Sequence, residues 1–407
     1  MQKLFLTFIL ASSLSLLACS TSSTVNTSRP KMEQEPVTKA KTTTNTSHKT
    51  PKSKQNYDSL LGLPPLVIPA DNPQTAAKIK LGKRLFEDKR FSGDGTVNCQ
   101  KCHDPSKGFA DQKPLAEGIG KQLGTRNSPT VINAAYFSSQ FWDGRQPSLE
   151  KQSKDPFLNP IEHGLKDHQK IMTIVRTDPQ YRQQFEQVFS TNLNNISMDH
   201  VAKAIASFER SVIAGNSPFD RYQYGGDPTA MSASAIKGLA LFRGKARCVS
   251  CHTIEQTNAT FTDNRFHNLG VSFHKVESRL AAIIDSFIDK KQDKNNIDEA
   301  ILTKTNISEL GRYAITQDPS DLGRFKTSTL RNIALTAPYM HDGSLARLKD
   351  VIELYNRGGD TKAALDGGIR PLNLTEQEKR DLIAFLESLT SDRFNPVAIN
   401  DTGESNE

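Results

Sequence analysis

Beyond its first eighteen residues, the 407-residue sequence has no long apolar run, which excludes a protein that crosses a membrane several times. Aromatic residues make up only 7% of the chain, Trp occurs once, and no segment alternates convincingly between apolar and polar residues. The last absence disfavours sheets and predicts a mainly helical fold. At about 100–200 residues per domain, the length predicts two or three domains.

The one apolar run lies at the N-terminus and has the length of a signal peptide. Lys3 precedes it, and it ends in Leu16-Leu17-Ala18-Cys19, which resembles a bacterial lipobox. We expect residues 1–18 to be a lipoprotein signal peptide and Cys19 to be acylated. The alternatives are an ordinary secretory signal with an incidental Cys and a retained anchor, which so short a run disfavours. Because Ser20 follows Cys19 instead of Asp, we expect an anchor in the outer membrane, facing the periplasm.

Residues 19–56 contain hardly any apolar side chains and are rich in Ser, Thr, Lys, Asn and Pro. Such a segment cannot bury enough surface to offset its ordering entropy, so we expect a lipidated, disordered linker. The formal net charge is +7, but residues 20–56 hold seven basic and two acidic residues, and the leader holds Lys3. Only +1 remains for residues 57–407, which removes the main support for a nucleic-acid partner.

Cysteine is scarce: apart from Cys19 the chain has four, in two identical frames, Cys99-Gln-Lys-Cys102-His103 and Cys248-Val-Ser-Cys251-His252. CxxCH is the attachment signature of haem c, in which the thiols form thioethers to the vinyl groups and the His binds iron. Disulfides suit an exported protein but do not explain the His in each frame. Structural zinc usually needs its halves about 15–20 residues apart, whereas these frames are 149 apart. We therefore predict two covalently bound haem c groups.

The two frames lie in related halves. At a constant offset of 199 residues, Trp142 falls opposite His341, and Thr130, Asn133, Asp143-Gly144 and Leu149 pair with Thr329, Asn332, Asp342-Gly343 and Leu348. We expect tandem cytochrome c-type domains at 57–215 and 216–395, followed by a tail at 396–407. Apolar periodicity predicts helices at 167–190, 198–214 and 375–390, the last opened by a Thr375-x-x-Glu378 capping box. Residues 275–310 are charged and indicate a surface insertion with a helix at 276–289.

Longer motifs carry a family resemblance. They are Phe141-Trp142-Asp143-Gly144-Arg145, Asn159-Pro160-Ile161-Glu162, Thr329-Leu330-Arg331-Asn332, Leu335-Thr336-Ala337-Pro338-Tyr339 and His341-Asp342-Gly343. Together with the CxxCH frames, they make residues 57–390 resemble the bacterial di-haem cytochrome c peroxidase and MauG superfamily. The resemblance implies that the N-terminal haem reacts with peroxide and that the C-terminal haem stores or delivers electrons.

The resemblance also implies roles for particular residues. Glu162 matches the family's catalytic carboxylate, Gln152 and Pro156 fall where the family lines the same pocket, and Trp142 matches the tryptophan between the haems. We therefore expect Glu162, Gln152 and Trp142 to serve catalysis. A calcium ion between the domains is expected on Asn127 and on the carbonyls of Thr336 and Pro338, oxygen ligands that suit calcium.

Three positions depart from the family pattern. The family's distal His would fall at Ile119, so we expect an open sixth position on the first haem iron. The family's Met ligand to the second haem is replaced by Tyr355, the MauG-like arrangement, and a hard anionic phenolate should lower the reduction potential. Met340 is the rival ligand. His163, where the family has Met, could assist Glu162, bind iron or be a polar residue outside the pocket. For His267 and His341 we expect hydrogen bonds to haem propionates or to the backbone.

These patterns favour a peroxidase that reduces hydrogen peroxide to water with electrons from a small periplasmic c-type cytochrome or cupredoxin. The alternative is a MauG-like enzyme that uses high-valent haem to oxidise a residue on a partner protein, although Trp142 leaves no second Trp for electron hopping. A third hypothesis, a non-catalytic di-haem electron carrier, requires both irons to be six-coordinate. Membrane contact is expected only through the lipid anchor, and the oligomeric state, a homodimer included, stays open.

Overall fold

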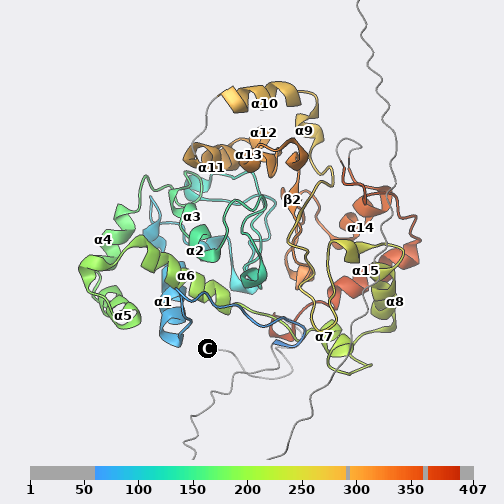
Figure 1. Cartoon of the computed structure of the whole chain (residues 1–407), viewed down its shortest axis with the longest axis horizontal. Helices are drawn as coiled ribbons and strands as arrows, with labels where there is room; N and C mark the ends of the chain where they lie inside the picture. The colour runs from blue at the N-terminus through green and yellow to red at the C-terminus, as the bar shows by residue number, and fades with distance from the viewer. Residues whose placement is uncertain (1–59, 290–293, 361–364, 395–407) are drawn as a thin grey trace, which may run out of the picture. The chain divides into compact units, whose positions relative to one another are not determined.

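The computed structural model describes residues 60–289, 294–360 and 365–394 (Figure 1). The expected signal peptide, Cys19, the linker and the tail at 396–407 lie outside these residues. As expected, the described chain is mainly helical. Its only named strands are β1 (Phe266–His267) and β2 (Phe325–Lys326), which pair antiparallel so that Phe266 lies opposite Lys326.

The described helices form one set in each half, and a third group lies within the second half of the sequence. The first set is α1 (Ala76–Phe86), α2 (Leu149–Gln152), α3 (Asp155–Leu158), α4 (Gln169–Thr177), α5 (Pro179–Phe189) and α6 (Met198–Ser211). The second set is α7 (Pro218–Gln223), α8 (Ala233–Arg243), α14 (Leu348–Arg357) and α15 (Glu376–Glu387). The third group, between α8 and α14, is α9 (His274–Glu277), α10 (Leu280–Asp289), α11 (Lys294–Thr303), α12 (Thr305–Ser308) and α13 (Tyr313–Thr316).

The predicted helices are present, but two of them are divided. The helix expected at 276–289 is divided between α9 and α10, with a turn at 278–279. The Thr375 side chain accepts a hydrogen bond from the Glu378 amide and the Glu378 side chain caps Thr375 in return, which confirms the capping box at the start of α15. The single helix expected at 167–190 is instead divided into α4 and α5. Pro179 has no amide hydrogen with which to continue α4, and the Asp178 carboxylate accepts hydrogen bonds from the first amides of α5.

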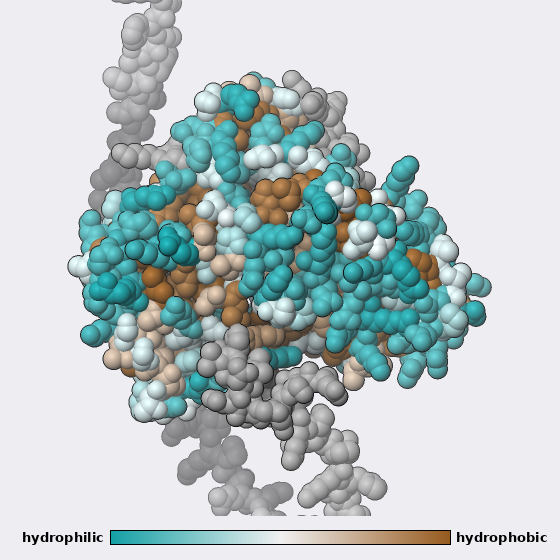
Figure 2. Space-filling model, turned by 180° about the vertical axis from the view of Figure 1, so that it is seen from behind, coloured by the Kyte–Doolittle hydropathy of each residue, from teal (hydrophilic) through white to brown (hydrophobic). Residues whose placement is uncertain are grey.

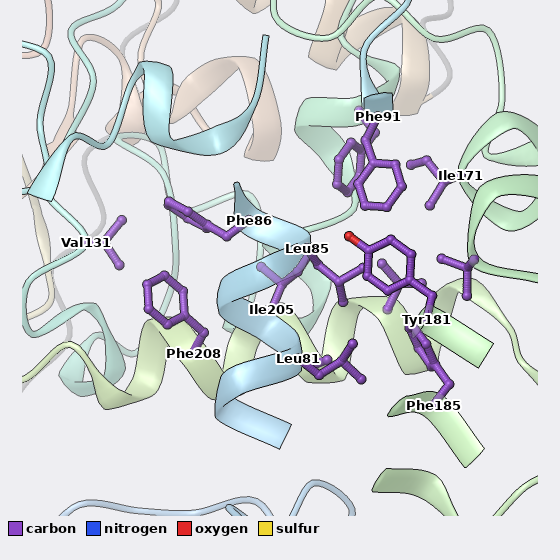
Figure 3. Close-up of a cluster of buried hydrophobic side chains, with 14 of the residues drawn as sticks. Leu81, Leu85, Phe86, Phe91, Val131, Ile171, Tyr181, Phe185, Ile205 and Phe208 are labelled. Carbon is purple, nitrogen blue, oxygen red and sulfur yellow. The ribbon is translucent and has the colours of Figure 1, made fainter. Parts of the chain in front are cut away.

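Each half is built around one close helix crossing. At Gly82 of α1, an added Cβ would lie 1.9 Å from the Ala204 carbonyl oxygen of α6, and at Gly238 of α8 it would lie 1.9 Å from the Asp381 carbonyl oxygen of α15. In Figure 3, α1 presents Leu81, Leu85 and Phe86 to side chains of α5 and α6, and these residues form the first core. The second core gathers Phe219, Phe242, Phe261 and Phe385 in edge-on and tilted ring contacts.

The equivalent positions also share hydrogen bonds, which confirms the 199-residue repeat. The Thr130 hydroxyl donates to the Gly108 carbonyl at 2.6 Å, and the Thr329 hydroxyl donates to the Thr260 carbonyl at 2.8 Å. Asn133 and Asn332 both take the left-handed conformation, with φ of 64° and 61°. The repeat is therefore one of backbone path as well as of sequence.

The ends of the described chain each reach across to the opposite half. The Asn216 amide donates to the Leu61 carbonyl and the Ala259 amide to the Gly62 carbonyl, both at 2.9 Å. At the other end, Arg393 donates to the Ile213 carbonyl at 2.7 Å, and the Phe394 ring packs 6.1 Å from that of Phe109. These contacts tie the halves together by both termini of the described chain.

Within residues 60–289, 294–360 and 365–394, no helix combines the length and apolarity needed to cross a bilayer. On the face seen in Figure 2, hydrophilic residues predominate and hydrophobic residues form separate patches.

Candidate functional site

Both CxxCH frames sit on short 3₁₀ turns, Cys99–Lys101 and Cys248–Ser250. In each turn, the backbone of the His is hydrogen-bonded to that of the first Cys. The His103 amide donates to the Cys99 carbonyl at 3.0 Å, and the His252 amide donates to the Cys248 carbonyl at 2.9 Å. The four described cysteines form no disulfide. Each frame therefore presents two thiols and one imidazole from a single turn, as haem c attachment requires.

The two histidines are oriented in the same way. His103 Nδ1 lies 3.3 Å from the Phe109 carbonyl oxygen, and His252 Nδ1 lies 2.9 Å from the Phe261 carbonyl oxygen. Donation from Nδ1 to a carbonyl leaves the Nε2 lone pair free for iron. Phe109 and Phe261 have φ of 53° and 52°, so a matching left-handed residue aims each carbonyl. The sequence places a Phe-x-Asp motif after each CxxCH frame, at Phe109 and Phe261, but did not indicate this role.

The first cavity, of about 130 Å³, contains Cys102 and His103 in its wall. The structure brings Gln152, Pro156, Glu162 and Trp142 to the same cavity. Burial raises the pKa of Glu162 to about 7, and the nearby Arg145 charge and a hydrogen bond from Asn159 lower it in part. Asn159 Nδ2 donates to Glu162 Oε1 at 2.8 Å. Glu162 therefore combines a fixed position with a pKa suited to proton transfer at neutral pH.

The second cavity is larger, about 450 Å³, and is lined by Cys248, Cys251 and His252. Tyr355 of α14 and Met340 both line it, so both predicted iron ligands face the second centre. Burial, with a smaller contribution from the nearby Cys248 and Cys251 charges, raises the pKa of the Tyr355 phenol. The Tyr355 phenol would therefore lose its proton only beside a positive charge. Ferric iron bound to the phenolate oxygen would provide that charge.

Trp142 and Asn127 line both cavities. Trp142 Nε1 donates to the Asn127 backbone carbonyl at 2.9 Å, and the Asn127 backbone amide donates to the His341 carbonyl at 2.8 Å. Thr336 and Pro338 share the second cavity with Asn127. Asn127 Nδ2 donates to the Lys113 carbonyl at 2.8 Å, which leaves Oδ1 to accept a cation. Amide and carbonyl oxygens are of the ligand type that calcium binds, and calcium at these residues stays a prediction.

Three further histidines have partners within the protein, and two of them, His267 and His341, line the second cavity. His163 is buried with Nδ1 3.1 Å from the Phe91 carbonyl, its ring packs 4.9 Å from Phe157, and it lines neither cavity. His267 lies between Asp263, at 2.8 Å, and Asp366, and His341 Nε2 lies 2.9 Å from Glu309 Oε2. Both imidazoles pair with carboxylates and not with the backbone, so the backbone alternative is wrong, whereas hydrogen bonds from His267 and His341 to haem propionates stay a prediction.

Sequence reasoning missed some residues of the first cavity. Glu209 of α6 lines it and is 6% exposed, and burial raises its pKa to about 8. Its Oε2 has no hydrogen-bond partner among the described residues. Leu302, from the segment expected to be a surface insertion, also lines the cavity. Neither Glu209 nor Leu302 lies in a sequence motif. The packing of α6 brings Glu209 to the first cavity, and the packing of the insertion brings Leu302 there.

The thiols fit haem c better than zinc. Burial raises the pKa of Cys102 and of Cys248 to about 12. Cys102 and Cys248 also line different cavities, so the frames do not form one four-Cys site. The two centres define the class of the protein as a c-type haem protein.

Comparison with known proteins gives the family. The family model for di-haem cytochrome c peroxidase matches residues 76–228. Cytochrome-c peroxidase IdrP1 of Denitromonas iodatirespirans is 39% identical over 332 residues, covering 81% of this chain and 85% of the relative. The methylamine utilization protein MauG of Methylorubrum extorquens is 34% identical over 331 residues, covering 81% and 82%. The chain therefore belongs to the di-haem cytochrome c peroxidase and MauG family of oxidoreductases, whose members hold two haem c groups.

The fold agrees with this assignment. The crystal structure of a MauG-like protein associated with microbial copper homeostasis has a TM-score of 0.67 and 32% identity, covering 84% of this chain and 98% of that one. Because relatives named peroxidase and relatives named MauG match over similar lengths, family membership alone does not separate the two activities.

Proposed function

We propose that this protein reduces hydrogen peroxide to water with electrons from a small c-type cytochrome or cupredoxin. The observation that carries the proposal is Glu162, a carboxyl group in the His103 cavity with its pKa raised to about 7. The overall reaction consumes one peroxide, two electrons and two protons and yields two waters. A haem c held by Cys99, Cys102 and His103 would supply the open iron site at which peroxide accepts electrons.

The proton chemistry belongs to Glu162. Asn159 donates to Oε1 at 2.8 Å, so Oε2 is the oxygen left to carry a proton. As peroxide enters, ionised Glu162 takes a proton from one oxygen and returns it to the other, which then leaves as water. Arg145, beside Glu162, keeps part of the carboxyl population ionised at neutral pH. Gln152 and Pro156 restrict the space around the entering peroxide.

Electron supply would come through the second centre. Trp142 lies in the walls of both cavities and is held by its indole donation to the Asn127 carbonyl. This position suits a relay between a haem on His252 and one on His103. Tyr355 would tune the second centre to a lower potential than a thioether would.

Electron paramagnetic resonance of the resting ferric protein, followed by one equivalent of peroxide, tests the proposal. We expect a high-spin signal from the His103 centre that peroxide abolishes, and steady-state oxidation of a reduced small cytochrome c. Two low-spin centres that do not respond to peroxide would contradict it and would restore the electron-carrier hypothesis.

Oxidation of a residue on a partner protein is the second candidate function. It is favoured by Tyr355 in the second cavity and by the similarity to the methylamine utilization protein MauG. This function predicts a long-lived oxidised state after peroxide addition without prior reduction, and slow turnover with a reduced cytochrome. Rapid turnover with the cytochrome would exclude it as the main activity.

We further propose calcium between the halves, on Asn127 Oδ1 and the carbonyls of Thr336 and Pro338. Chelation should alter the spectrum of the holoprotein, and added calcium should restore it, whereas Asn127→Ala should remove the response. A spectrum indifferent to chelator and calcium would contradict this site.

We also propose that Cys19 anchors the protein by lipid to the outer membrane, on the periplasmic side. Labelling of cells with a radioactive fatty acid should mark the wild type but not Cys19→Ala. A labelled variant, or an unlabelled wild type, would contradict the anchor.

A further inference from the structure

The helices α9 to α13, which we name the helical insert, have a small core of their own. Phe273, Ile283, Phe287, Ile301 and Leu310 are among its buried residues. The insert belongs to the second half of the sequence, between the CxxCH frame of that half and its later motifs. The proposed function uses none of its residues.

The insert nevertheless contacts the walls of the first cavity. The Thr125 hydroxyl donates to the Ile301 carbonyl at 2.7 Å. Arg126 donates from Nε to the Ser308 hydroxyl at 2.9 Å and from Nη2 to the Ser308 carbonyl at 3.0 Å. Thr125 and Arg126 both line the first cavity, and both are buried. Buried hydrogen bonds from two adjacent wall residues fix the insert against the cavity.

One face of α11 is directed to the Glu162 side of this cavity. Asp298 and Leu302 are four residues apart and so share a helix face. Asp298 Oδ1 lies 3.3 Å from Arg145 Nε, and the Arg145 charge is the largest influence lowering the pKa of Glu162. Leu302 itself lines the cavity. The helix face that carries Leu302 is thus linked through the Asp298–Arg145 ion pair to the first cavity, which also contains Glu162.

We propose that Leu302 is a specificity-determining residue, which closes the first cavity so that hydrogen peroxide reaches Glu162 and bulky organic hydroperoxides do not. The inference rests on the proposed peroxidase function, because it assigns the substrate size of that same site. An apolar wall suits this role, since it limits size without offering a hydrogen bond that would hold the substrate away from Glu162.

Leu302 also packs against the core of the helical insert, so a purely structural role must be distinguished. Leu280 provides the matched control. It is a partly buried Leu that packs against the same core, and it lines neither cavity. Leu280→Ala therefore removes the same atoms from the same insert without enlarging the first cavity.

The first measurement is steady-state peroxidase activity of the holoenzyme with hydrogen peroxide and with cumene hydroperoxide. In Leu302→Ala, the ratio of kcat/KM for cumene hydroperoxide to that for hydrogen peroxide should rise about tenfold, the usual effect of added space in an apolar pocket. In Leu280→Ala the ratio should stay at the wild-type value. Equal ratios in wild type and Leu302→Ala, or equal changes in both variants, would overturn the inference.

The second measurement does not depend on turnover. Cyanide and 4-phenylimidazole are titrated into the ferric holoprotein while the Soret band is followed. Leu302→Ala should bind 4-phenylimidazole about tenfold more tightly and cyanide as the wild type does, whereas Leu280→Ala should bind both as the wild type does. If the wild type does not reduce peroxide but this selectivity changes, the proposed function fails and the role of Leu302 stands. If the wild type reduces peroxide and the selectivity does not change, the role of Leu302 fails alone.

Discussion

The two halves of the molecule share their backbone arrangement around the CxxCH frame but differ in the side chains that line their cavities. In both, a His donates from Nδ1 to the carbonyl of a left-handed Phe, and a glycine lets two helices cross closely. The first cavity adds two carboxyl groups of raised pKa, Glu162 and Glu209, and the second adds a phenol and a thioether. The repeated scaffold therefore positions two metal-binding imidazoles, and the side chains opposite them decide which centre reacts and which transfers electrons.

The largest effect that would sharpen this comparison is expected from Glu162→Gln. The amide keeps the shape of the carboxyl group but cannot accept the peroxide proton, so kcat/KM for hydrogen peroxide should fall about 10²–10⁴-fold. The reduction potential of the second haem should not change, because Glu162 does not line the second cavity. Stopped-flow mixing with peroxide and a redox titration measure the two quantities. Glu186→Gln, the same change at an exposed residue of α5, is the control, and comparable losses in both variants would remove Glu162 from the mechanism.

The second-largest effect is expected from Tyr355→Phe, which should change the reduction potential of the second haem. Loss of an anionic oxygen ligand should raise the midpoint potential of the second haem and alter its ferric spectrum. Met340→Ala should leave both unchanged, although Met340 lines the same cavity. Redox titration with optical detection follows each variant. If Met340→Ala shifts the potential and Tyr355→Phe does not, the thioether is the ligand and the second centre resembles that of other di-haem peroxidases.

The two helix crossings should respond equally to mutation if the halves share one scaffold. In Gly82→Ala and Gly238→Ala, the new Cβ would meet a backbone carbonyl oxygen 1.9 Å away, which requires the helices to separate. We expect each to lower the free energy of unfolding by about 1–3 kcal/mol, more than the roughly 0.5–1 kcal/mol that Ala gains over Gly in a helix. Guanidinium unfolding measures both. Gly367→Ala, with nothing within 4 Å of the new atom, should be neutral, and a loss confined to one half would break the comparison.

The sequence was enough to predict what depends on local pattern. The CxxCH frames, the capping box at Thr375 and the 199-residue repeat need only neighbouring residues or a constant spacing, and the structure agrees with each. The cavity residues Glu162, Gln152 and Trp142 came from the family resemblance and do meet at the first cavity.

Long-range packing accounts for what was not predicted. Asp263 is only four residues from His267, but the second partner of His267, Asp366, and the partner of His341, Glu309, lie 99 and 32 residues away in sequence, which no local pattern indicates. Leu302 reaches the first cavity only because the insert docks through Thr125 and Arg126. The many charged residues at 275–310 indicated a surface segment. They gave no sign of the apolar side chains with which the same segment packs.

The smallest effect concerns how the first cavity sets the pKa of Glu162. The Asn159 side chain donates to Glu162 Oε1, which favours the charged carboxylate and lowers its pKa against the stronger effect of burial. Because only the ionised carboxylate accepts a proton, the wild-type rate with peroxide should fall as pH drops below about 7. Asn159→Ala removes the donor, so the pKa should rise and the fall in rate should begin at higher pH. Rates with peroxide across pH test this, since a merely structural role for Asn159 would lower the rate at every pH without moving the midpoint.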